Sequence, residues 1–221
     1  MSVLDGVTVA VLGGTGPQGR GLVRRWAAAG IAVVVGSRAA ERAADTASDL
    51  ADATGGDVRG LANAAAAAAA DVVVLAVPWE GHADLARSLA TALAGKVVVD
   101  CVNPLGFDQQ GPFALDVADG SAAQQAAALL PESTVVAAFH HVSAALLDDP
   151  SVESFDLDVL VLGDDRDATD LVRALADAIP GMRGLYAGRL RNARQVEALT
   201  ANLIAINRRY RAHAGIRVTD V

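Results

Sequence analysis

The sequence predicts an α/β fold, a doubly wound parallel sheet followed by a small, mainly helical C-terminal domain. Short, wholly apolar runs alternate along the chain with longer segments of helical periodicity. Strands that are apolar on both faces belong to a parallel sheet covered by helices on each side. A glycine-rich turn directly follows the first apolar run. We expect two domains, residues 1–150 and residues 151–221.

The expected elements follow one another in a regular order. Strands are predicted at residues 7–12, 31–35, 72–77, 96–99, 134–139 and 158–163. Helices are predicted at residues 17–29, 39–53, 64–70, 80–94, 121–130, 165–178 and about 190–212. Between residues 103 and 120 lies a loop with three glycines and two prolines, which is long enough to be functional.

Composition limits the classes of protein to consider. The chain has 221 residues, enough to bury a sizeable core, and no apolar run approaches the length that crosses a bilayer. Its formal charge of −8 argues against nucleic acid as a partner. Its only cysteine is Cys101 and its four histidines are scattered, so we expect a reducing, cytoplasmic location and no metal site.

The first chemically informative segment is the turn Gly14-Thr15-Gly16-Pro17-Gln18-Gly19. Glycines here let the backbone approach a pyrophosphate, and the N-terminus of the following helix offers free N–H groups and the positive end of its dipole. Because the turn comes after a strand and opens a helix, it matches the dinucleotide-binding fingerprint of Rossmann-type domains. The alternative is a glycine turn that serves packing alone.

The end of the second strand indicates which dinucleotide is bound. NAD-binding domains usually carry an acidic residue there, which holds the ribose 2′-hydroxyl. This chain has Ser37 and Arg38 instead, with Arg42 one helical turn further on. A hydroxyl and two guanidinium groups favour the 2′-phosphate of NADP(H). The alternative is that the arginines are ordinary surface residues.

Three later strands also end in segments that can line a ligand site, because ligands of such folds bind at the carboxyl ends of the strands. These segments are Val77-Pro78-Trp79, Cys101-Val102-Asn103-Pro104 and Phe139-His140-His141-Val142-Ser143-Ala144. Trp79 either walls the nicotinamide pocket or belongs to the core, and we expect His82 and Asp84 at the surface. Adjacent histidines in an extended chain point to opposite faces and make a poor metal pair.

The C-terminal region is rich in arginine, with eight arginines against Glu197 and Asp220 in residues 183–221. One interpretation is a helix that faces solvent or another subunit, and the other is a docking surface for an anionic small molecule. Apolar residues also recur at helical spacing at Val196, Leu199, Leu203 and Ile206. We expect this helix to lie at or near the interface of a homodimer.

Taken together, these segments resemble the deazaflavin-dependent NADP oxidoreductases, also called NADPH-dependent coenzyme F420 reductases. The resemblance covers nearly the whole chain and rests on Val11 to Gly16, Val35-Gly36-Ser37-Arg38, Val77-Pro78-Trp79, Phe139-His140, Gly163-Asp164-Asp165 and Ala187 to Arg194. It implies a Rossmann domain and a small C-terminal domain, with the deazaflavin lying in the cleft between them over the nicotinamide.

The resemblance also implies residue roles. Thr15, Gly16, Pro17 and Gln18 would hold the pyrophosphate, and Ser37, Arg38 and Arg42 the 2′-phosphate. Val77, Asn103 and Ala144 would contact the nicotinamide half, and His140 and Val142 the deazaflavin. Because the deazaflavin coenzyme is strongly anionic, we further expect Arg191 and Arg194, in the positively charged C-terminal region, to receive its tail. The chain departs from the archaeal pattern at His141-Val142-Ser143, where Thr-Ile-Pro is expected, and at Asn103, where a hydrophobic residue is common.

The function that follows is reversible hydride transfer between NADP(H) and coenzyme F420. Such a reaction needs no metal and no catalytic acid or base, because the protein contributes mostly by orienting two rings. Two alternatives stay open. One is an NADPH-dependent reductase of another acceptor, such as ferric ion through a flavin or an imine, and the other is a non-catalytic NADP-sensing module.

Overall fold

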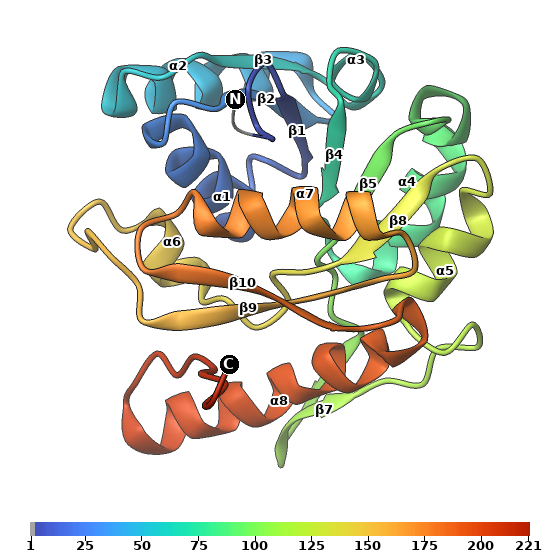
Figure 1. The fold of residues 1–221 in the computed structure, drawn as a ribbon, viewed down its shortest axis with the longest axis vertical. Coiled ribbons are helices and arrows are strands. Elements are labelled where there is room, and N and C mark those ends of the chain that lie inside the picture. The colour runs from blue at the N-terminus through green and yellow to red at the C-terminus, as the bar shows by residue number, and fades with distance from the viewer. Residues whose placement is uncertain (1–2) are drawn as a thin grey trace.

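The computed structural model describes residues 3–221 and is built around one eight-stranded sheet (Figure 1). The strand order is β10-β9-β8-β5-β4-β1-β2-β3. The strands comprise β1 (Thr8–Leu12), β2 (Ala32–Ser37), β3 (Val58–Ala62), β4 (Val72–Leu75), β5 (Val97–Asp100), β8 (Thr134–Ala137), β9 (Leu157–Gly163) and β10 (Met182–Gly188). From β3 to β8 all neighbours pair in parallel, whereas β9 is antiparallel to β8. The predicted doubly wound sheet is confirmed, but it is mostly and not wholly parallel, because β9 runs against β8.

Helices cover both faces of this sheet. They comprise α1 (Pro17–Ala28), α2 (Ala40–Thr54), α3 (Asn63–Ala68), α4 (Trp79–Leu93), α5 (Ala122–Leu129), α6 (Ala144–Asp148), α7 (Arg166–Asp177) and α8 (Ala193–Tyr210). In β1 the side chains alternate between two cores: Val9 and Val11 pack with α1, α2 and α7, whereas Ala10 and Leu12 pack with α3, α4 and α5. This two-sided burial explains why the strand is apolar throughout.

Two edge strands and a hairpin were not predicted from the sequence. β3 and β10 contain glycine and arginine and are only partly buried, so neither shows the continuous apolar pattern of the inner strands. The predicted loop at residues 103–120 contains a two-stranded hairpin, β6 (Leu105–Asp108) and β7 (Gly111–Ala114). Residues 151–221 thus contribute β9, α7 and β10 to the main sheet as well as α8, and the division into domains at residue 150 stays a prediction.

The last helix is divided differently from the single helix predicted at residues 190–212. A short 3-10 turn, η1 (Leu190–Asn192), precedes α8, which packs beside the β6–β7 hairpin (Figure 1). Of the four apolar positions noted in the sequence, Val196 and Leu203 are buried within the chain, whereas Leu199 and Ile206 are exposed. No helix within residues 3–221 combines the length and the apolar character needed to cross a membrane.

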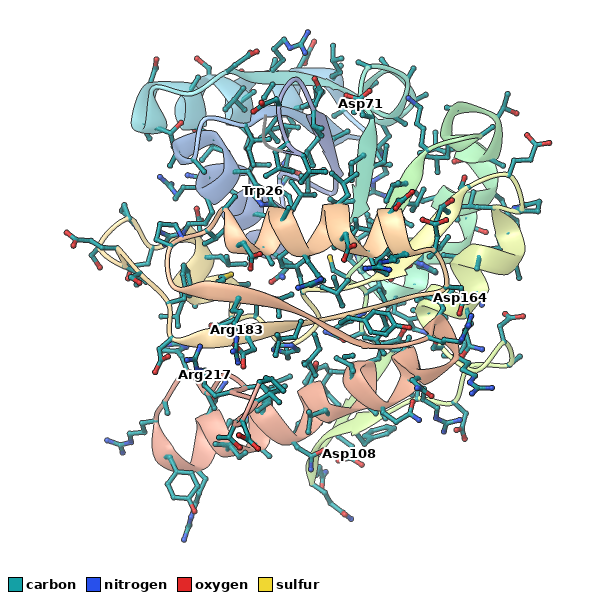
Figure 2. The ribbon with its side chains drawn as sticks, viewed as in Figure 1. Trp26, Asp71, Asp108, Asp164, Arg183 and Arg217 are labelled. Atoms are coloured by element: carbon teal, nitrogen blue, oxygen red, sulfur yellow. The ribbon has the colours of Figure 1, made fainter. Side chains whose placement is uncertain are left out.

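Beyond α8, the chain returns along β9 and is held there by the buried carboxylate of Asp158. This carboxylate accepts hydrogen bonds from the Arg183 guanidinium at 2.8 and 2.9 Å, from Arg217 at 3.2 Å and from the Val218 N–H at 2.7 Å. The hydrogen bond from Arg183 is the main cause that lowers the pKa of Asp158 to about 2. Figure 2 shows Arg183 and Arg217 close together between the sheet and α8.

A buried arginine, Arg25 on α1, connects the segment around α6 to the Rossmann core. Its guanidinium donates to four backbone carbonyls, those of Leu146 (2.7 Å), Leu147 (2.8 Å), Asp149 (2.7 Å) and Val152 (2.6 Å). The planar fork of arginine suits this arrangement because its five N–H donors point in fixed directions.

We therefore expect Arg25→Lys to destabilise the fold. An ammonium group is a single point with three donors and cannot reach all four carbonyls, and each buried carbonyl left without a partner costs about 1–3 kcal/mol. Urea unfolding followed by circular dichroism should show a loss of about 2–4 kcal/mol. Arg166→Lys is the matched control because that side chain is 92% exposed. Equal stability of the two variants would contradict this role of Arg25.

Candidate dinucleotide and substrate site

A cavity of about 510 Å³ opens at the carboxyl edge of the parallel strands. It lies where the β1–α1 turn meets the ends of β4, β5 and β8, and α8 forms its far wall. Eight residues predicted from the sequence lie together on its wall: Gly16, Pro17, Gln18, Val77, Asn103, His140, Val142 and Ala144. In open α/β sheets this crevice, where the strand order reverses, is the usual ligand site.

The glycine turn at one end of the cavity is shaped by very close backbone approaches. Gly13 has a φ of +82°, and a Cβ added there would lie 2.3 Å from the carbonyl oxygen of Ala76, at the end of β4. A Cβ on Gly19 would lie 2.5 Å from the Gly13 oxygen, so the first turn of α1 sits directly on the loop. Only glycine fits either position.

The start of α1 is suited to an anion. Gly16 is the N-cap and offers no side chain, and Pro17 has no N–H. The N–H groups of Gln18 and Gly19 then have no acceptor within the helix, and Thr15 lies in the turn just before them. This cradle of glycines and free donors fits the pyrophosphate of a dinucleotide.

The segment predicted to select NADP(H) lies at the end of β2, next to β1. The hydroxyl of Ser37 accepts a hydrogen bond from the Ala39 N–H at 3.3 Å, and its oxygen is the last polar side-chain atom of the strand. Arg38 and Arg42 are both exposed, and neither forms an ion pair with another residue of the described chain. Two free guanidinium groups beside a hydroxyl fit a phosphate monoester.

Asn63, at the start of α3, lies close to this end of the site, against Gly36 of β2. Its Oδ1 atom is buried and has no hydrogen-bond partner within the described residues. It faces Gly36, at a position where a glycine Cβ would lie 3.1 Å from the oxygen. An unpaired buried acceptor is costly unless a ligand or water satisfies it.

The loop after β8 carries backbone strain. Phe139 is buried with a φ of +63°, in the left-handed region that non-glycine residues rarely occupy. Two contacts hold it there: the ring packs edge-on against Trp26 at 5.6 Å, and the Gln18 amide donates to the Phe139 carbonyl at 3.2 Å. Such strain costs about 1–3 kcal/mol and is often found at functional sites.

The two histidines that follow are both buried and neutral at physiological pH. Burial lowers the pKa of His140 to about 4 and that of His141 to about 4. The ring nitrogens of His140 form no well-aligned hydrogen bond within the described chain, although backbone carbonyls of Cys101 and Val102 lie nearby. The Nε2 atom of His141 accepts the Leu160 N–H at 3.3 Å, which ties the loop to β9.

The backbone carbonyl of His140 joins three elements at the cavity wall. It accepts hydrogen bonds from the Asn103 amide at 2.8 Å and from the Thr200 hydroxyl of α8 at 3.1 Å. The amide of Asn103, at a position where the resemblance led us to expect a hydrophobic residue, therefore has a structural partner.

Sequence reasoning missed the contribution of the C-terminal region to this wall. The cavity is also lined by Thr200, Leu203, Ile204, Asn207 and Ala214. The side-chain Oδ1 atom of Asn207 accepts the Ala214 N–H at 2.6 Å, so α8 and the returning tail are fixed together. Thr200 and Asn207 lie two turns apart on the helix. The signal that could have identified this face of α8 is that Thr200 and Asn207 recur at the same helical spacing as the apolar residues Leu203 and Ile204.

None of the residues that line the cavity is Asp, Glu, Lys or Arg. Cys101 lines it, but its thiol donates to the Leu75 carbonyl at 3.1 Å, and burial raises the thiol pKa. Within residues 3–221 no group of three or more His, Cys, Asp or Glu residues could hold a metal ion. The wall is therefore uncharged at neutral pH, which suits flat rings better than acid–base chemistry.

The two arginines predicted to receive an anionic tail lie outside the cavity. Arg194 is paired with Asp116 at 2.6 Å, whereas Arg191 is exposed in η1 and forms no ion pair with the described residues. Much of the arginine-rich region binds acidic groups of the same chain, as Arg189 does with Asp164 at 3.4 Å.

The expectation that His82 lies at the surface is wrong. His82 is fully buried, and its Nε2 atom lies 2.6 Å from Oδ2 of Asp100 at the end of β5. The residue sits on the inner face of α4 together with Ala86 and Leu89, at helical spacing. Trp79 stacks on its ring at 5.5 Å instead of lining the cavity, and Asp84 is exposed as expected.

Comparison with known proteins shows the family to which the chain is related. Residues 8–104 match the family model described as NADP oxidoreductase, coenzyme F420-dependent. The F420-dependent NADP reductase of Methanothermobacter thermautotrophicus is 42% identical over 96% of this chain and 95% of its own length. The reductase of the same name from Methanocaldococcus jannaschii is 38% identical over 96% of this chain and 98% of its own.

Among solved structures, one from Arthrobacter sp. FB24, provisionally named an F420-dependent NADP reductase, superposes with a TM-score of 0.80. It is 29% identical, and the match covers 97% of this chain and 100% of that one. Since two relatives exceed 30% identity over nearly their full length, this chain belongs to the family of F420-dependent NADP reductases.

Proposed function

We propose that this chain catalyses reversible hydride transfer between NADP(H) and the 8-hydroxy-5-deazaflavin coenzyme F420. The observation that carries the proposal is the uncharged cavity at the point where the dinucleotide turn, the ends of three further strands and α8 meet. Residues predicted to contact the nicotinamide and residues predicted to contact the deazaflavin lie together on the wall of this cavity, as stacking of the two rings requires.

The roles proposed for the residues follow their places in the fold. Thr15, Gly16, Pro17 and Gln18 hold the pyrophosphate at the start of α1, and Ser37, Arg38 and Arg42 hold the 2′-phosphate. The nicotinamide half lies against Val77, Asn103 and Ala144, and the deazaflavin against His140 and Val142.

Catalysis in this proposal is mostly orientation. NADP(H) and the deazaflavin supply the hydride chemistry when both are bound. The chain excludes water with a largely apolar wall and fixes that wall through the His140 carbonyl, which is held by Asn103 and Thr200. Orientation of reacting groups at near-attack distance can supply several kcal/mol of the barrier. No cavity side chain needs to act as a strong acid or base.

Mixing the purified chain with NADPH and oxidised coenzyme F420 tests this function directly. We expect the visible absorbance of the deazaflavin to bleach as NADPH is consumed, and the reverse with NADP⁺ and reduced deazaflavin. Parallel reactions with a flavin plus ferric ion and with a cyclic imine test a reductase of another acceptor. Turnover with one of those and none with the deazaflavin would overturn the proposal. Binding of NADPH without turnover of any acceptor would favour a sensing module.

Arg38→Ala should weaken NADPH selectively. A charge-assisted hydrogen bond contributes about 1.5–3 kcal/mol, so we expect Kd for NADPH to rise about 10–100-fold while Kd for NADH hardly changes. Isothermal titration with both nucleotides measures this. Arg87→Ala, on the exposed side of α4, is the charge-matched control. Equal losses for both nucleotides would refute the 2′-phosphate assignment.

The anionic tail of coenzyme F420 gives Arg191 a proposed role in docking. The coenzyme carries a phosphodiester and an oligoglutamate tail, and the chain as a whole has a charge of −8, so a local positive surface is needed to receive it. We place that surface at Arg191, with Arg194 beside it on the next element, although Asp116 already neutralises part of the charge of Arg194.

Salt dependence tests this docking surface. Exposed charge contacts are screened by salt, so KM for the deazaflavin should rise with ionic strength more steeply than KM for NADPH. Arg191→Ala should raise the first constant several-fold and leave the second nearly unchanged. Arg166→Ala, whose side chain is exposed on α7, serves as control. A deazaflavin KM that responds to neither salt nor Arg191→Ala would remove support for tail docking.

We also propose that the protein is a cytoplasmic homodimer with α8 at or near the interface. Large apolar side chains are exposed on α8 and on the hairpin packed beside it: Phe107, Phe113, Leu199, Ile206 and Tyr210. Contiguous exposed apolar surface commonly marks an interface between proteins.

Analytical ultracentrifugation checks the assembly. The wild-type chain should sediment as a dimer at micromolar concentration, and Ile206→Glu should shift it toward monomer because a charge would be buried without a partner. Val3→Glu, at another exposed apolar residue, is the control. A wild-type monomer at these concentrations would contradict the proposal.

A further inference from the structure

Behind the cavity lies a group of buried polar side chains that the proposed function does not use. We call Glu197 of α8, His82 of α4, Asp100 of β5 and Gln125 of α5 the buried polar cluster. The first three are at most 2% exposed, and none of the four lines the cavity. Buried ionisable groups are costly unless they are paired, so their presence here requires an explanation.

Glu197 ties α8 to α5. Its Oε2 atom accepts the Ala122 N–H at 2.9 Å, and its Oε1 atom accepts the Ala123 N–H at 3.1 Å. These are first-turn N–H groups of α5, which have no acceptor within their own helix. A carboxylate there also meets the positive end of the helix dipole. The side chain of one helix thus binds the N-terminus of another that lies 74 residues earlier in the chain.

Gln125 continues the connection from α5 to His82. Its Nε2 atom donates to the Asp119 carboxylate at 3.3 Å, which leaves its Oε1 atom to face Nδ1 of His82 at 3.2 Å. Nδ1 must then carry a proton. Burial opposes charge on His82, but the hydrogen bond and the charge of Asp100 outweigh it, so the pKa of His82 is raised. On the other side of the ring, Nε2 lies 2.6 Å from Oδ2 of Asp100, so His82 bridges α5 and β5.

Asp100 carries the connection into the cavity wall. Its second oxygen accepts the Val102 N–H at 3.0 Å, which fixes the turn that leads to Asn103. From α8 the same wall is reached through Thr200, which lies three residues after Glu197 and therefore on the same side of the helix. Asn103 and Thr200 both donate to the His140 carbonyl. The buried polar cluster therefore fixes both residues that donate to the His140 carbonyl, Asn103 and Thr200, on the side away from the cavity.

We infer that Glu197 is a positioning residue that sets the placement of Thr200, and with it the His140 carbonyl, at the wall where the deazaflavin binds. The inference rests on the proposed function for its kinetic consequence, whereas the link between α8 and α5 does not depend on the identity of the acceptor. Loss of one carboxylate oxygen should let α8 shift relative to the β5 and β8 loops without altering the phosphate sites.

The substitution Glu197→Gln tests this because it keeps the shape and removes one acceptor and the charge. At pH 8 we expect kcat with NADPH and coenzyme F420 to fall roughly 10-fold, since small misplacements of reacting groups cost rate. The Kd of NADP⁺ should stay within about twofold, because the hydrogen bonds of Glu197 go to α5 and not to the residues placed at the phosphates. Amide hydrogen exchange at Ala122 and Ala123 should become faster, which reports the lost contact without any acceptor.

Thr200→Val should reproduce the loss in kcat, because it removes the hydroxyl that meets the His140 carbonyl. If both residues act through that carbonyl, the double variant should lose little more than either single one, whereas independent effects would multiply. Glu153→Gln is the matched control, since this exposed glutamate undergoes the same change of charge. Multiplying effects would overturn the inference, and so would a folded Glu197→Gln with an unchanged kcat.

The pH profile adds a readout that a purely structural role would not move. Burial raises the pKa of Glu197 to about 7, despite its two N–H donors and the nearby His82, and Asp100 adds to the rise. As pH falls through 7 the carboxylate gains a proton and loses an acceptor site, so it comes to resemble Gln. The kcat of wild type and Glu197→Gln should therefore converge at pH 5.5 and diverge at pH 8. Parallel profiles would overturn the inference.

Stability provides a check that involves no substrate. Because the folded pKa of Glu197 lies above that of the unfolded chain, wild type should lose stability as pH rises from about 5 to 8, and Glu197→Gln should lose less over the same range.

If Glu197→Gln fails to fold, Glu197→Asp keeps the charge but withdraws it by one methylene, and an unchanged kcat would then overturn the inference. If the wild type does not turn over the deazaflavin at all, the proposed function fails. The exchange and stability results would still decide whether Glu197 couples the two helices.

Discussion

The close contact between the β1–α1 turn and the end of β4 determines where everything else in the site can lie. A Cβ atom on Gly13 would clash with the carbonyl oxygen of Ala76, and a Cβ atom on Gly19 would clash with the carbonyl oxygen of Gly13. A side chain at either position would separate the two strand ends or lift α1 from the turn. Because both contacts are made, the free N–H groups of α1 face the same crevice as the ends of β4 and β5. The phosphate cradle and the ring cavity are consequences of one backbone arrangement.

The opposite side of the cavity depends on the His140 carbonyl. It gathers donors from the β5 loop and from α8, and it directly follows Phe139, whose backbone is strained. The edge-on contact with Trp26 and the bond from Gln18 resist relaxation of that strain. Since Gln18 belongs to the dinucleotide turn, the strained loop is connected to the cofactor end of the site as well. A rigid wall of this kind is what orientation of two rings requires.

How far the sequence predicts this structure depends on the range of the interactions involved. Inner strands such as β1 and β4 are buried on both faces, so their composition alone identifies them, and the rule that ligands bind at the carboxyl ends of strands then brings the predicted residues together. The edge strands β3 and β10 are not predicted from the sequence, because their partial exposure permits arginine and glycine within them. The buried contacts of His82 and Glu197 are not predicted for another reason, since the residues they bind lie far away in the sequence. Helical spacing could have indicated that His82 faces inward, but not what it meets.

The distribution of charge fits the proposed reaction. In the proposed arrangement, unpaired arginines and the free N–H groups of α1 lie where the phosphates of NADP(H) would bind, whereas no Asp, Glu, Lys or Arg lines the cavity. In the proposed reaction NADPH gives up a hydride and leaves a cationic nicotinamide ring, so a protonated His140 on the deazaflavin side of the stacked rings would oppose this direction by repulsion. Burial prevents this, because it holds the pKa of His140 near 4 and the ring neutral at physiological pH. A neutral wall also leaves the reverse direction open, since it stabilises neither charge state strongly over the other. The ionisable groups of the buried polar cluster lie outside the cavity and reach its wall through hydrogen bonds, such as that from the Val102 N–H to Asp100.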